Sequence, residues 1–535
     1  MEEQPGRENA TTEAGRGIAG AAGIIALGNV TSRVVGLVRV TVIADLFGAT
    51  GLVSAYQIAA TVPTMIYDLL IGGMLSSALV PVFSEYAAAR TKEELWHIVS
   101  VILSLTAVTL SLVVVVLELL APQVAWLLGG GFVGTELQTV TTTSIRIVVP
   151  AVLLLGLAGI VTGLLYTLKR FTYPAFGATV FNLGIILGAL FLSKPLRIYS
   201  LVIGTVLGAA LQLAIQLPGL RGTRLSFSLD LSHPGLRRIA LLYTPIVLGL
   251  VISQIQVAID RNLASRTGEQ SIAWMQNATH LIQFPHGLVA VAISLAVLPS
   301  LSQLSAIADW TGYRRTLAMG LRMVVVLIFP ATVGLFIMAK LIIALIFEHG
   351  AFTAYDTAWT AFALRCYLLG LVFAAVDWPL NYAFYARQDT LTPASVGVLS
   401  VLVYLIVALP LMRPLGMIGL VLADSAKHTA HALTMLVLLH RRVGSLRGHG
   451  VGATTFKTIL ASAVMGTLTY WTMVWLQRVV DVGRLWGELA VVGVAGLTGL
   501  VVYGLLVTLM GVEEVKLIWE MVRTRLLGSL TGDEG

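Results

Sequence analysis

The sequence is poor in charge and has almost no cysteine. Only 11% of its 535 residues are Asp, Glu, Lys or Arg, whereas a soluble protein carries about 25%. The single cysteine, Cys366, rules out an intramolecular disulfide. Hydrophobic residues make up 57% of the chain. These features exclude a water-soluble domain and a disulfide-stabilised secreted one, and they indicate a membrane protein.

Several signatures of other protein classes are missing as well. No Gly-x-x-x-x-Gly-Lys loop is present, which argues against ATP-driven pumping by this chain. The net charge of +7 is spread over short segments and forms no basic block for nucleic acid. The sequence shows neither zinc-site spacing nor the alternating segments of a membrane barrel. We therefore expect a helical, multi-pass membrane protein that is not an enzyme and requires no cofactor.

Apolar runs of about 20 residues, the length that crosses a bilayer, recur along the chain. They predict an all-α protein with about fourteen transmembrane helices. We place these near 18–46, 51–84, 95–121, 137–168, 173–193, 198–218, 236–264, 271–305, 315–346, 357–386, 392–412, 415–440, 456–477 and 485–511. Lys and Arg are concentrated in alternate connecting segments, which predicts that both termini are cytoplasmic.

The chain also repeats itself. Ala55-Tyr56 matches Ala273-Trp274 at an offset of 218 residues, and Tyr166 matches Tyr385 at 219. Each repeat holds six spans, an even number, so the two repeats share one orientation and form two parallel lobes. The predicted divisions are a disordered cytoplasmic tail (1–17), two six-helix lobes (18–220 and 221–445), an added pair of helices (446–512) and a second tail (513–535).

Two arginines, Arg33 and Arg39, lie inside the first predicted span, where a charge costs roughly 3 kcal/mol. They face either a pathway for an anionic substrate or a neighbouring helix in a structural role, and the residue types alone leave both open. Six residues place them about 240° apart around a helix. A bend near Gly36 is therefore expected, so that both reach one cavity.

Three residues form a candidate cation site. Asp377 and Asn381 lie one turn apart on one helix face, with Pro379 between them, and Asp260 lies in the seventh span. Their oxygen atoms suit sodium, so we expect a sodium or proton coupling site. For Asp260 the alternative is a salt bridge at the end of its helix.

A polar patch in the twelfth span contains Asp424, Lys427, His428 and His431. One interpretation is a cluster that neutralises itself through the Asp424 carboxylate. The other is a proton-sensitive switch, because histidine titrates near neutral pH. The first interpretation is favoured.

Five local motifs carry a resemblance to a known family: TSRVVGLVR (31–39), LFGATG (46–51), ALVPVFSEY (78–86), FEHGAFTAYDT (347–357) and FYARQDTLTP (384–393). With them the chain resembles the MurJ (MviN) family of the MOP transporter superfamily. That family flips lipid II, an undecaprenyl-pyrophosphate-linked peptidoglycan precursor, across the bacterial inner membrane. The resemblance implies alternating access through a cavity between two lobes, a lipid-tail groove lined by the added helices, and the cell-wall synthesis machinery as a partner.

The resemblance also assigns roles to individual residues. The family's cavity arginines fall on Arg33 and Arg39, whose guanidinium groups suit phosphate oxygens. His280 stands where the family has an arginine and would assist when protonated. Some members have a sodium site similar to Asp260, Asp377 and Asn381.

The chain departs from the family pattern at several cavity positions: Val40, Ser54, Tyr67, Asp68, Gly72 and Gln283. These residues replace charged or acidic groups of the family. Two alternatives therefore stay open. One is a flippase or exporter of another lipid-linked polysaccharide, and the other is a non-transporting paralogue that acts as a cell-wall scaffold.

Overall fold

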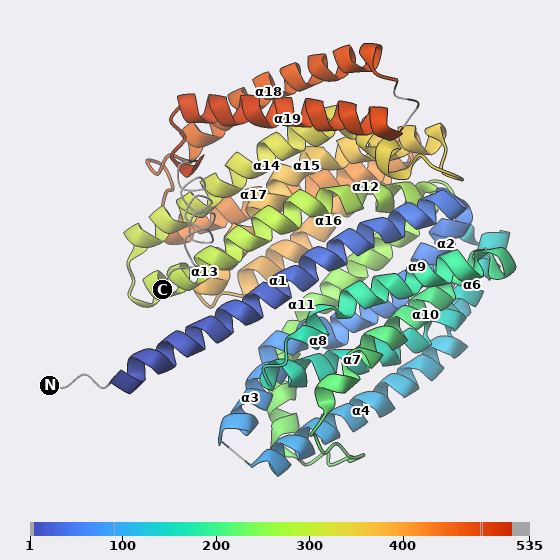
Figure 1. The fold of residues 1–535 in the computed structure, drawn as a ribbon, viewed down its shortest axis with the longest axis vertical. Coiled ribbons are helices and arrows are strands. Elements are labelled where there is room, and N and C mark those ends of the chain that lie inside the picture. Colours follow the sequence, from blue (N-terminus) through green and yellow to red (C-terminus); the bar gives the residue numbers. More distant parts are fainter. Residues whose placement is uncertain (1–4, 90, 482, 484, 516–535) are drawn as a thin grey trace. The chain divides into compact units, whose positions relative to one another are not determined.

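The computed structural model describes residues 5–89, 91–481, 483 and 485–515, which form two compact units (Figure 1). The first unit contains the described residues up to Ala273 together with Gly350–Phe352. The second contains Trp274–His349 and the described residues from Thr353 onward. All regular structure among the described residues is helical, as the sequence predicts.

The first unit is built around long helices joined by short turns. Its elements are α1 (Pro5–Phe47), α2 (Gly51–Tyr67), the π-helices η1 (Asp68–Gly72) and η2 (Leu75–Leu79), α3 (Val80–Ala89), α4 (Lys92–Leu119), α5 (Ala121–Leu128), the 3₁₀ turn η3 (Gly130–Phe132), α6 (Glu136–Val148), α7 (Pro150–Thr167), α8 (Thr172–Ala175), α9 (Gly177–Leu196), α10 (Tyr199–Ala214), the 3₁₀ turn η4 (Leu217–Leu220) and α11 (Pro234–Ser265). Helix α1 begins at Pro5, within the segment predicted to be a tail.

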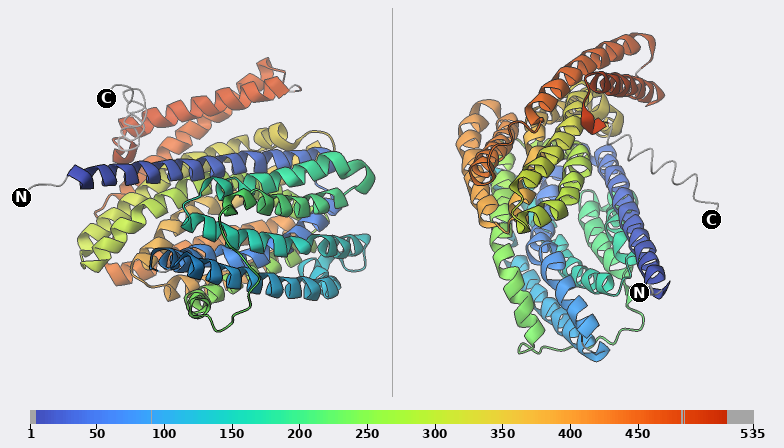
Figure 2. Two further views of the ribbon diagram at one scale, coloured as in Figure 1. Left: turned by 60° about the horizontal axis from the view of Figure 1, so that its bottom comes forward. Right: turned by 90° about the vertical axis from the view of Figure 1, so that its left-hand side faces the viewer.

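The second unit has fewer and longer helices. They are α12 (Ser271–Pro285), the π-helix η5 (His286–Ala290), α13 (Val291–Ala306), α14 (Trp310–Phe347), α15 (Ala354–Ala386), α16 (Leu391–Leu415), α17 (Met417–Val443), α18 (Val451–Val479) and α19 (Leu485–Leu509). Helices α18 and α19 run side by side, as the red pair in Figure 2. Most of the predicted tail 513–535 lies outside the described residues, and the predicted lobe boundaries stay a prediction.

Ten helices among the described residues are long and apolar enough to cross a membrane. Helix α11 adds an eleventh candidate span if its two parts, which meet at an angle of 56°, cross the membrane as one. The three remaining predicted spans correspond to α1, to the segment from α2 to α3, and to α17. The polar patch of α17 makes it less apolar than the ten helices that are apolar enough to cross a membrane.

The sequence repeat reappears as a repeat of helix boundaries. Four pairs of elements begin 218 residues apart: η1 and η5 at Asp68 and His286, α4 and α14 at Lys92 and Trp310, α6 and α15 at Glu136 and Ala354, and α10 and α17 at Tyr199 and Met417. Corresponding caps match as well, because Thr91 accepts from the Glu94 amide and Asp309 accepts from the Gly312 amide. The offset found in the sequence is therefore an offset between corresponding helices.

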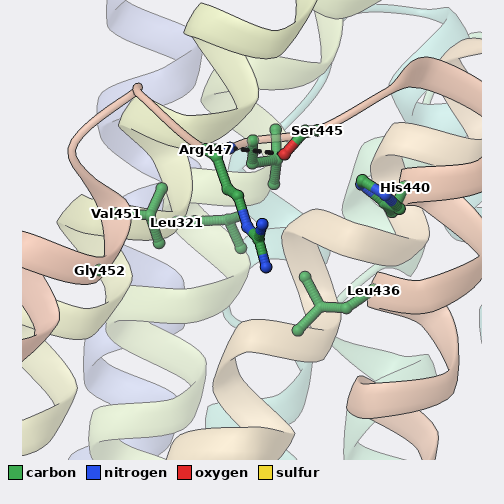
Figure 3. A pocket seen from close by; sticks show the side chains of 8 residues that line it. Leu321, Leu436, His440, Ser445, Arg447, Val451 and Gly452 are labelled. Carbon is green, nitrogen blue, oxygen red and sulfur yellow. Dashed lines mark hydrogen bonds between the residues drawn. The ribbon is translucent and has the colours of Figure 1, made fainter.

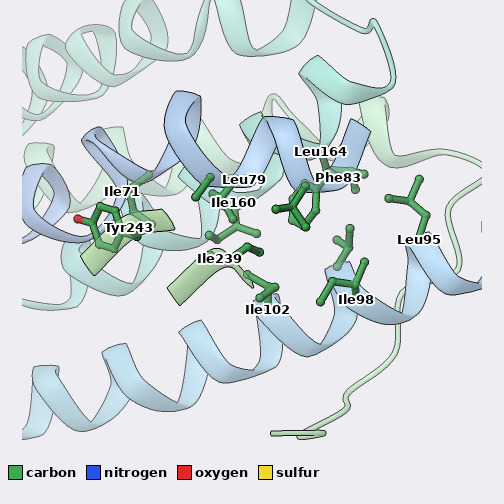
Figure 4. Close-up of a cluster of buried hydrophobic side chains, with 13 residues drawn as sticks. Ile71, Leu79, Phe83, Leu95, Ile98, Ile102, Ile160, Leu164, Ile239 and Tyr243 are labelled. Atoms are coloured by element: carbon green, nitrogen blue, oxygen red, sulfur yellow. The ribbon is translucent and has the colours of Figure 1, made fainter. Parts of the chain in front are cut away.

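A buried apolar cluster joins the π-helical segment of the first unit to its neighbours (Figure 4). It includes Ile71, Phe83, Ile98, Ile160 and Ile239, which come from η1, α3, α4, α7 and α11. Within lipid, such packing stabilises helix association more than the hydrophobic effect does. The cluster therefore fixes the course of the broken second span.

Glycines allow helices to approach closely around η1. A Cβ added at Gly159 would lie 2.1 Å from Cγ2 of Ile71, and one at Gly73 would lie 2.9 Å from Ile246. The hydroxyl of Tyr243 donates to the carbonyl of Leu69, a backbone acceptor within η1 itself. The irregular turn is thus held by packing and by a side-chain hydrogen bond, as a helix break within a bilayer requires.

The most specific motif of the sequence, FEHGAFTAYDT, forms the turn between α14 and α15. Thr353 and Asp356 make a reciprocal capping box at the start of α15. The Trp274 indole donates to the Asp356 carboxylate at 2.9 Å, and the Thr357 hydroxyl donates to Glu348 at 2.6 Å. The motif therefore has a structural role at this helix start.

Asp356→Ala should lower the melting temperature of the purified chain. It removes a cap worth about 1 kcal/mol, and it leaves the buried Trp274 indole without its acceptor, at a cost of about 1–3 kcal/mol. Asp356→Asn keeps a carbonyl acceptor and should lose less. Glu93→Ala, at an exposed acidic residue in the first turn of α4, is the control. Equal melting temperatures for Asp356→Ala and the control would contradict the role of this turn.

Candidate functional site

Helix α1 packs closely against the end of α8 and the start of α9. A Cβ added at Gly28 would lie 2.2 Å from the carbonyl oxygen of Ala175, so only glycine allows this approach. The hydroxyls of Thr31 and Thr179 lie 3.1 Å apart across the two helices. This contact sets the depth and rotation of α1, and with them the position of its arginines.

One buried asparagine holds Arg39. The Arg39 Nη1 donates to Oδ1 of Asn182 in α9 at 2.9 Å. The amide nitrogen of the same Asn182 donates to the carbonyl of Ser32 at 3.3 Å. Asn182 is 8% exposed. It therefore joins α1 to α9 while it orients the guanidinium group.

Arg39 keeps donor capacity that the protein does not use. Its buried Nε has no hydrogen-bond partner in the described part of the chain. Tyr56 of α2 lies within electrostatic range, with its hydroxyl 3.2 Å from that of Thr205. An orphaned donor on a cation within a membrane span is suited to an anionic ligand.

The expected bend in the first span is wrong. Helix α1 is one unbroken α-helix from Pro5 to Phe47 with Gly36 in its interior, and Figure 1 draws this helix without a sharp bend. A Cβ at Gly36 would meet only the amide of Asn182, at 3.5 Å, so this glycine gives room to the asparagine. Arg33 is half-buried. Arg33 and Arg39 belong to the first unit and His280 to the second, so their common site stays a prediction.

Several positions at which the chain departs from the family pattern can be described by their burial and their hydrogen bonds. Ser54 is fully buried, and its hydroxyl accepts from the Ala273 amide at 3.3 Å. Val40 is buried in the core. Asp68, at the start of η1, is exposed. His280 of α12 lies 3.4 Å from the side-chain nitrogen of Gln276. Ser54 therefore serves helix packing at its position.

Asp377 has a partner that the sequence analysis did not anticipate. His431 Nδ1 of α17 lies 2.5 Å from Asp377 Oδ1 of α15, and the two side chains are 12% and 16% exposed. Asn381 donates to the backbone carbonyl of Asp377 at 2.8 Å. Asp377 and Asn381 thus share a face as predicted. Asp260 lies in the first unit, so the three-residue cation site stays a prediction.

The polar patch of α17 is largely neutralised, as the favoured interpretation expects. Lys427 Nζ lies 2.5 Å from one oxygen of Asp424, and His428 Nε2 lies 3.7 Å from the other. His431 is the exception, because it turns to Asp377. Residues 377 and 431 lie on different helices with no local spacing between them, so this pair could not be predicted from the sequence.

An apolar cavity of about 260 Å³ lies between α14, α18 and α19. Its wall is formed by Leu327, Pro330, Ala331, Gly334, Met338, Met465, Thr469, Gly496, Gly499, Leu500 and Tyr503. Helices α18 and α19, the added pair, therefore line this cavity together with α14.

A second cavity, of about 480 Å³, lies where α17 ends and α18 begins. Figure 3 shows Arg447 reaching between Leu321 and Leu436, with His440 beside it. The Arg447 amide donates to the Ser445 hydroxyl at 3.0 Å.

Comparison with known proteins identifies the relatives of this chain. The family model described as "Lipid II flippase MurJ" matches residues 43–489. The lipid II flippase MurJ of Burkholderia cenocepacia is 30% identical over 420 residues, covering 77% of this chain and 81% of that protein. The probable lipid II flippase MurJ of Vibrio cholerae is 30% identical over 513 residues, covering 92% and 95%.

Solved structures show the same fold. A structure of lipid II flippase MurJ in an inward closed conformation has a TM-score of 0.75 at 26% identity, covering 94% of this chain and 99% of that one. An inward-facing MATE-family multidrug transporter has a TM-score of 0.66 at 12% identity, a likeness of fold alone, covering 78% and 95%. These likenesses confirm an all-helical membrane fold of about 14 transmembrane helices.

A double-mutant cycle on Arg39→Ala and Asn182→Ala should show that the two side chains interact. A hydrogen bond to a charged group contributes about 1.5–3 kcal/mol, so the two losses of stability should be less than additive by about that amount. Arg146→Ala, at an exposed arginine of α6, should be additive with Asn182→Ala to within about 0.5 kcal/mol. Unfolding free energies of the detergent-solubilised chain provide the measurement. Additivity in both cycles would contradict the assigned contact.

Proposed function

This chain belongs to the lipid II flippase MurJ family, and from that premise we propose that it flips lipid II across the bacterial inner membrane by alternating access. The family is one of multi-pass membrane transporters and not of enzymes. In this proposal both termini are cytoplasmic, and the flipped precursor passes to the cell-wall synthesis machinery outside. One observation supports the site most directly. The guanidinium group of Arg39 is held by Asn182, and its buried Nε has no hydrogen-bond partner among the described residues.

Arg33 and Arg39 hold the pyrophosphate in this proposal. A guanidinium fork binds two phosphate oxygens at once and keeps its charge when it is desolvated. The family match begins after Arg39, at residue 43. The role proposed for Arg33 and Arg39 therefore rests on the motif TSRVVGLVR and on the contacts of α1. His280 assists from the second unit when its ring is protonated.

The polyprenyl tail lies along the apolar cavity between α14, α18 and α19. The cavity wall is apolar apart from Thr469 and the Tyr503 hydroxyl, and part of it lies on α18 and α19, the two helices outside the repeat. A long isoprenoid chain needs such a wall at the lipid boundary, while the glycan needs water. This division lets the head group cross while the tail stays in the bilayer.

The coupling cation is the second part of the proposal. Asp260, Asp377 and Asn381 are the residues proposed to bind sodium or a proton. Among them, Asp377 is the strongest candidate, because its half-buried carboxylate pairs with a residue of another helix. A cation gradient acting through Asp377 would drive transport without nucleotide.

Arg33→Ala and Arg39→Ala should each abolish flipping while the chain still inserts, because removing a charge lowers the cost of insertion. Lysine at either position should rescue only partly, since an ammonium lacks the bidentate fork. Growth of a flippase-depleted bacterium and the lipid II exposed on its outer surface are the measurements. Arg146→Ala is the matched control and should support growth.

The same experiment separates the alternatives. Full growth with both alanine variants would contradict the pyrophosphate role and leave the arginines a structural one. If the unmodified chain is inserted but fails to rescue, lipid II is the wrong substrate, as for an exporter of another polysaccharide or a scaffold.

Gly496→Leu should slow flipping of lipid II with its full-length tail. A Cβ at Gly496 points into the groove and meets only Met338, at 3.9 Å, so a larger side chain occupies the cavity without disturbing the backbone. Gly493→Leu, where an added Cβ meets nothing within 4 Å, is the control on the same helix. A short-tailed lipid II analogue should be affected less by Gly496→Leu. Equal rates for both variants with the full-length lipid would contradict the tail site.

A further inference from the structure

The segment that connects η4 to α11 has an amphipathic sequence. Its residues 223–230 form neither helix nor strand. Between 225 and 232 apolar and polar side chains alternate. The apolar ones are Leu225, Phe227, Leu229 and Leu231, and the polar ones are Ser226, Ser228, Asp230 and Ser232. In an extended chain this alternation places the two kinds of side chain on opposite faces. Residues 223–232, the connecting segment, therefore have one apolar face and one polar face.

The connecting segment is bonded along its length to α4. The amide of Ser226 donates to the Ser100 hydroxyl, and the amide of Ser228 donates to the Ser104 hydroxyl, each at 3.0 Å. Every second amide is thus bonded to the same helix, which is the pattern of an extended chain that lies against it. A backbone amide without a partner is costly in hydrocarbon. The two serine hydroxyls of α4 remove that cost for these amides.

Both ends of the connecting segment are held as well. Arg170 Nη1 donates to the carbonyl of Arg221 at 2.9 Å, just before the segment. At its other end, His233 Nδ1 accepts from the Gly235 amide at 3.1 Å and caps α11. The segment is therefore fixed at its start, middle and end, and it presents its apolar face in a defined position.

Most of this apolar face is uncovered. Leu225 packs against the buried cluster shown in Figure 4. The next three apolar side chains are exposed, Phe227 by 73%, Leu229 by 46% and Leu231 by 68%. A contiguous exposed apolar surface usually marks contact with a partner or a membrane.

The position of the segment along α4 indicates which of these covers it. Asp230 lies 3.6 Å from Nε2 of His97, in the polar first turns of α4, and both side chains are partly exposed. Ser104 lies seven residues beyond His97, which is about 10 Å along a helix. Helix α4 is itself a candidate membrane span. Amphipathic segments bury their apolar face about 5–10 Å into the boundary between head groups and acyl chains, and the connecting segment lies at that level.

Arginines bracket the exposed apolar residues. Arg221 and Arg224 precede them and Arg237 follows them, and all three side chains are exposed. The next arginine, Arg238, pairs instead with Glu85 at 2.7 Å. Exposed arginines beside an apolar surface are attracted to a membrane leaflet that contains anionic lipids. The charge around the segment thus complements acidic phospholipid head groups.

We infer that the connecting segment is a membrane-surface anchor. Phe227, Leu229 and Leu231 insert among the acyl chains of the leaflet on the predicted cytoplasmic side, and the three arginines bind the phosphates of anionic lipids. The anchor holds the chain between the two repeats at the membrane surface, whichever lipid is transported. A soluble protein partner fits less well, because Ser228 is bonded to α4 at a level within its apolar stretch.

Spin labels on the purified full chain test the anchor. The buried Cys366 is replaced by serine, and a nitroxide is attached to Phe227→Cys or, as the matched control, to Ser232→Cys, at an exposed residue of the polar face. The chain is placed in liposomes of phosphatidylcholine and phosphatidylglycerol. The label at position 227 should be more accessible to oxygen, which concentrates in lipid, than to a water-soluble nickel complex. The label at position 232 should show the reverse.

Removal of the bonds to α4 should move the label at position 227 towards water. Ser100→Ala combined with Ser104→Ala removes both acceptors of the segment's amides. Ser111→Ala, at an exposed serine of the same helix, is the control and should leave the label in lipid. An unchanged label in the double variant would contradict the role of the two serines in holding the anchor.

Removal of positive charge tests the lipid class. An arginine near an anionic surface strengthens attachment about fivefold, so Arg221→Gln combined with Arg224→Gln should lower the ratio of lipid-inserted to water-exposed label by up to about 25-fold. In liposomes of phosphatidylcholine alone the same double variant should have no effect. Equal effects in both kinds of liposome would overturn the assignment of anionic lipids.

The unmodified chain provides a check that needs no substitution. A photoreactive carbene reagent dissolved in the bilayer is activated, and the chain is then denatured and digested with trypsin. Cleavage after Arg224 and Arg237 releases residues 225–237 as one peptide, and its adducts should fall on Phe227, Leu229 and Leu231. A peptide without adducts would overturn the anchor. So would a label at position 227 that the nickel complex reaches more readily than oxygen, which would indicate a face for a soluble partner. Either result leaves the proposed flipping of lipid II unaffected.

Discussion

The cost of placing an ionic group in hydrocarbon governs this structure. Three charged side chains within the spans lie beside a polar partner from another turn or another helix. Arg39 has Asn182, Asp377 has His431, and Asp424 has Lys427. Because such partners must be fixed in place, the helices that carry them pack closely, and glycines such as Gly28 allow that approach. The polar sites and the tight packing are therefore consequences of one constraint.

The sequence predicts the architecture well because the bilayer limits the possibilities. Apolar length identifies the spans, and the internal match at an offset of 218 residues identifies corresponding helices, which begin at Lys92 and Trp310 or at Glu136 and Ala354. The α17 patch is also foreseeable, since Asp424, Lys427 and His428 lie within one turn. Local spacing is enough wherever partners share a helix.

Partners on different helices could not be predicted in this way. Asn182 lies 143 positions from Arg39, and nothing near either residue indicates the other. The same holds for His431 and Asp377. The expected bend at Gly36 failed for a related reason. The glycine was treated as a hinge, whereas it makes room for the Asn182 side chain that orients Arg39. Side-chain pairs across helices depend on packing, which a single sequence does not record.

The π-helical turns bear on the history of the chain. A π-turn arises when one residue is inserted into an α-helix, and η1 and η5 lie at equivalent places in the two halves. The simplest history is that the insertion came first and a gene duplication then copied it. The two copies have since diverged in chemistry, with Asp68 in one and His286 in the other. The same irregular turn therefore occurs in both halves, although the residue at its start is an acid in one half and a histidine in the other.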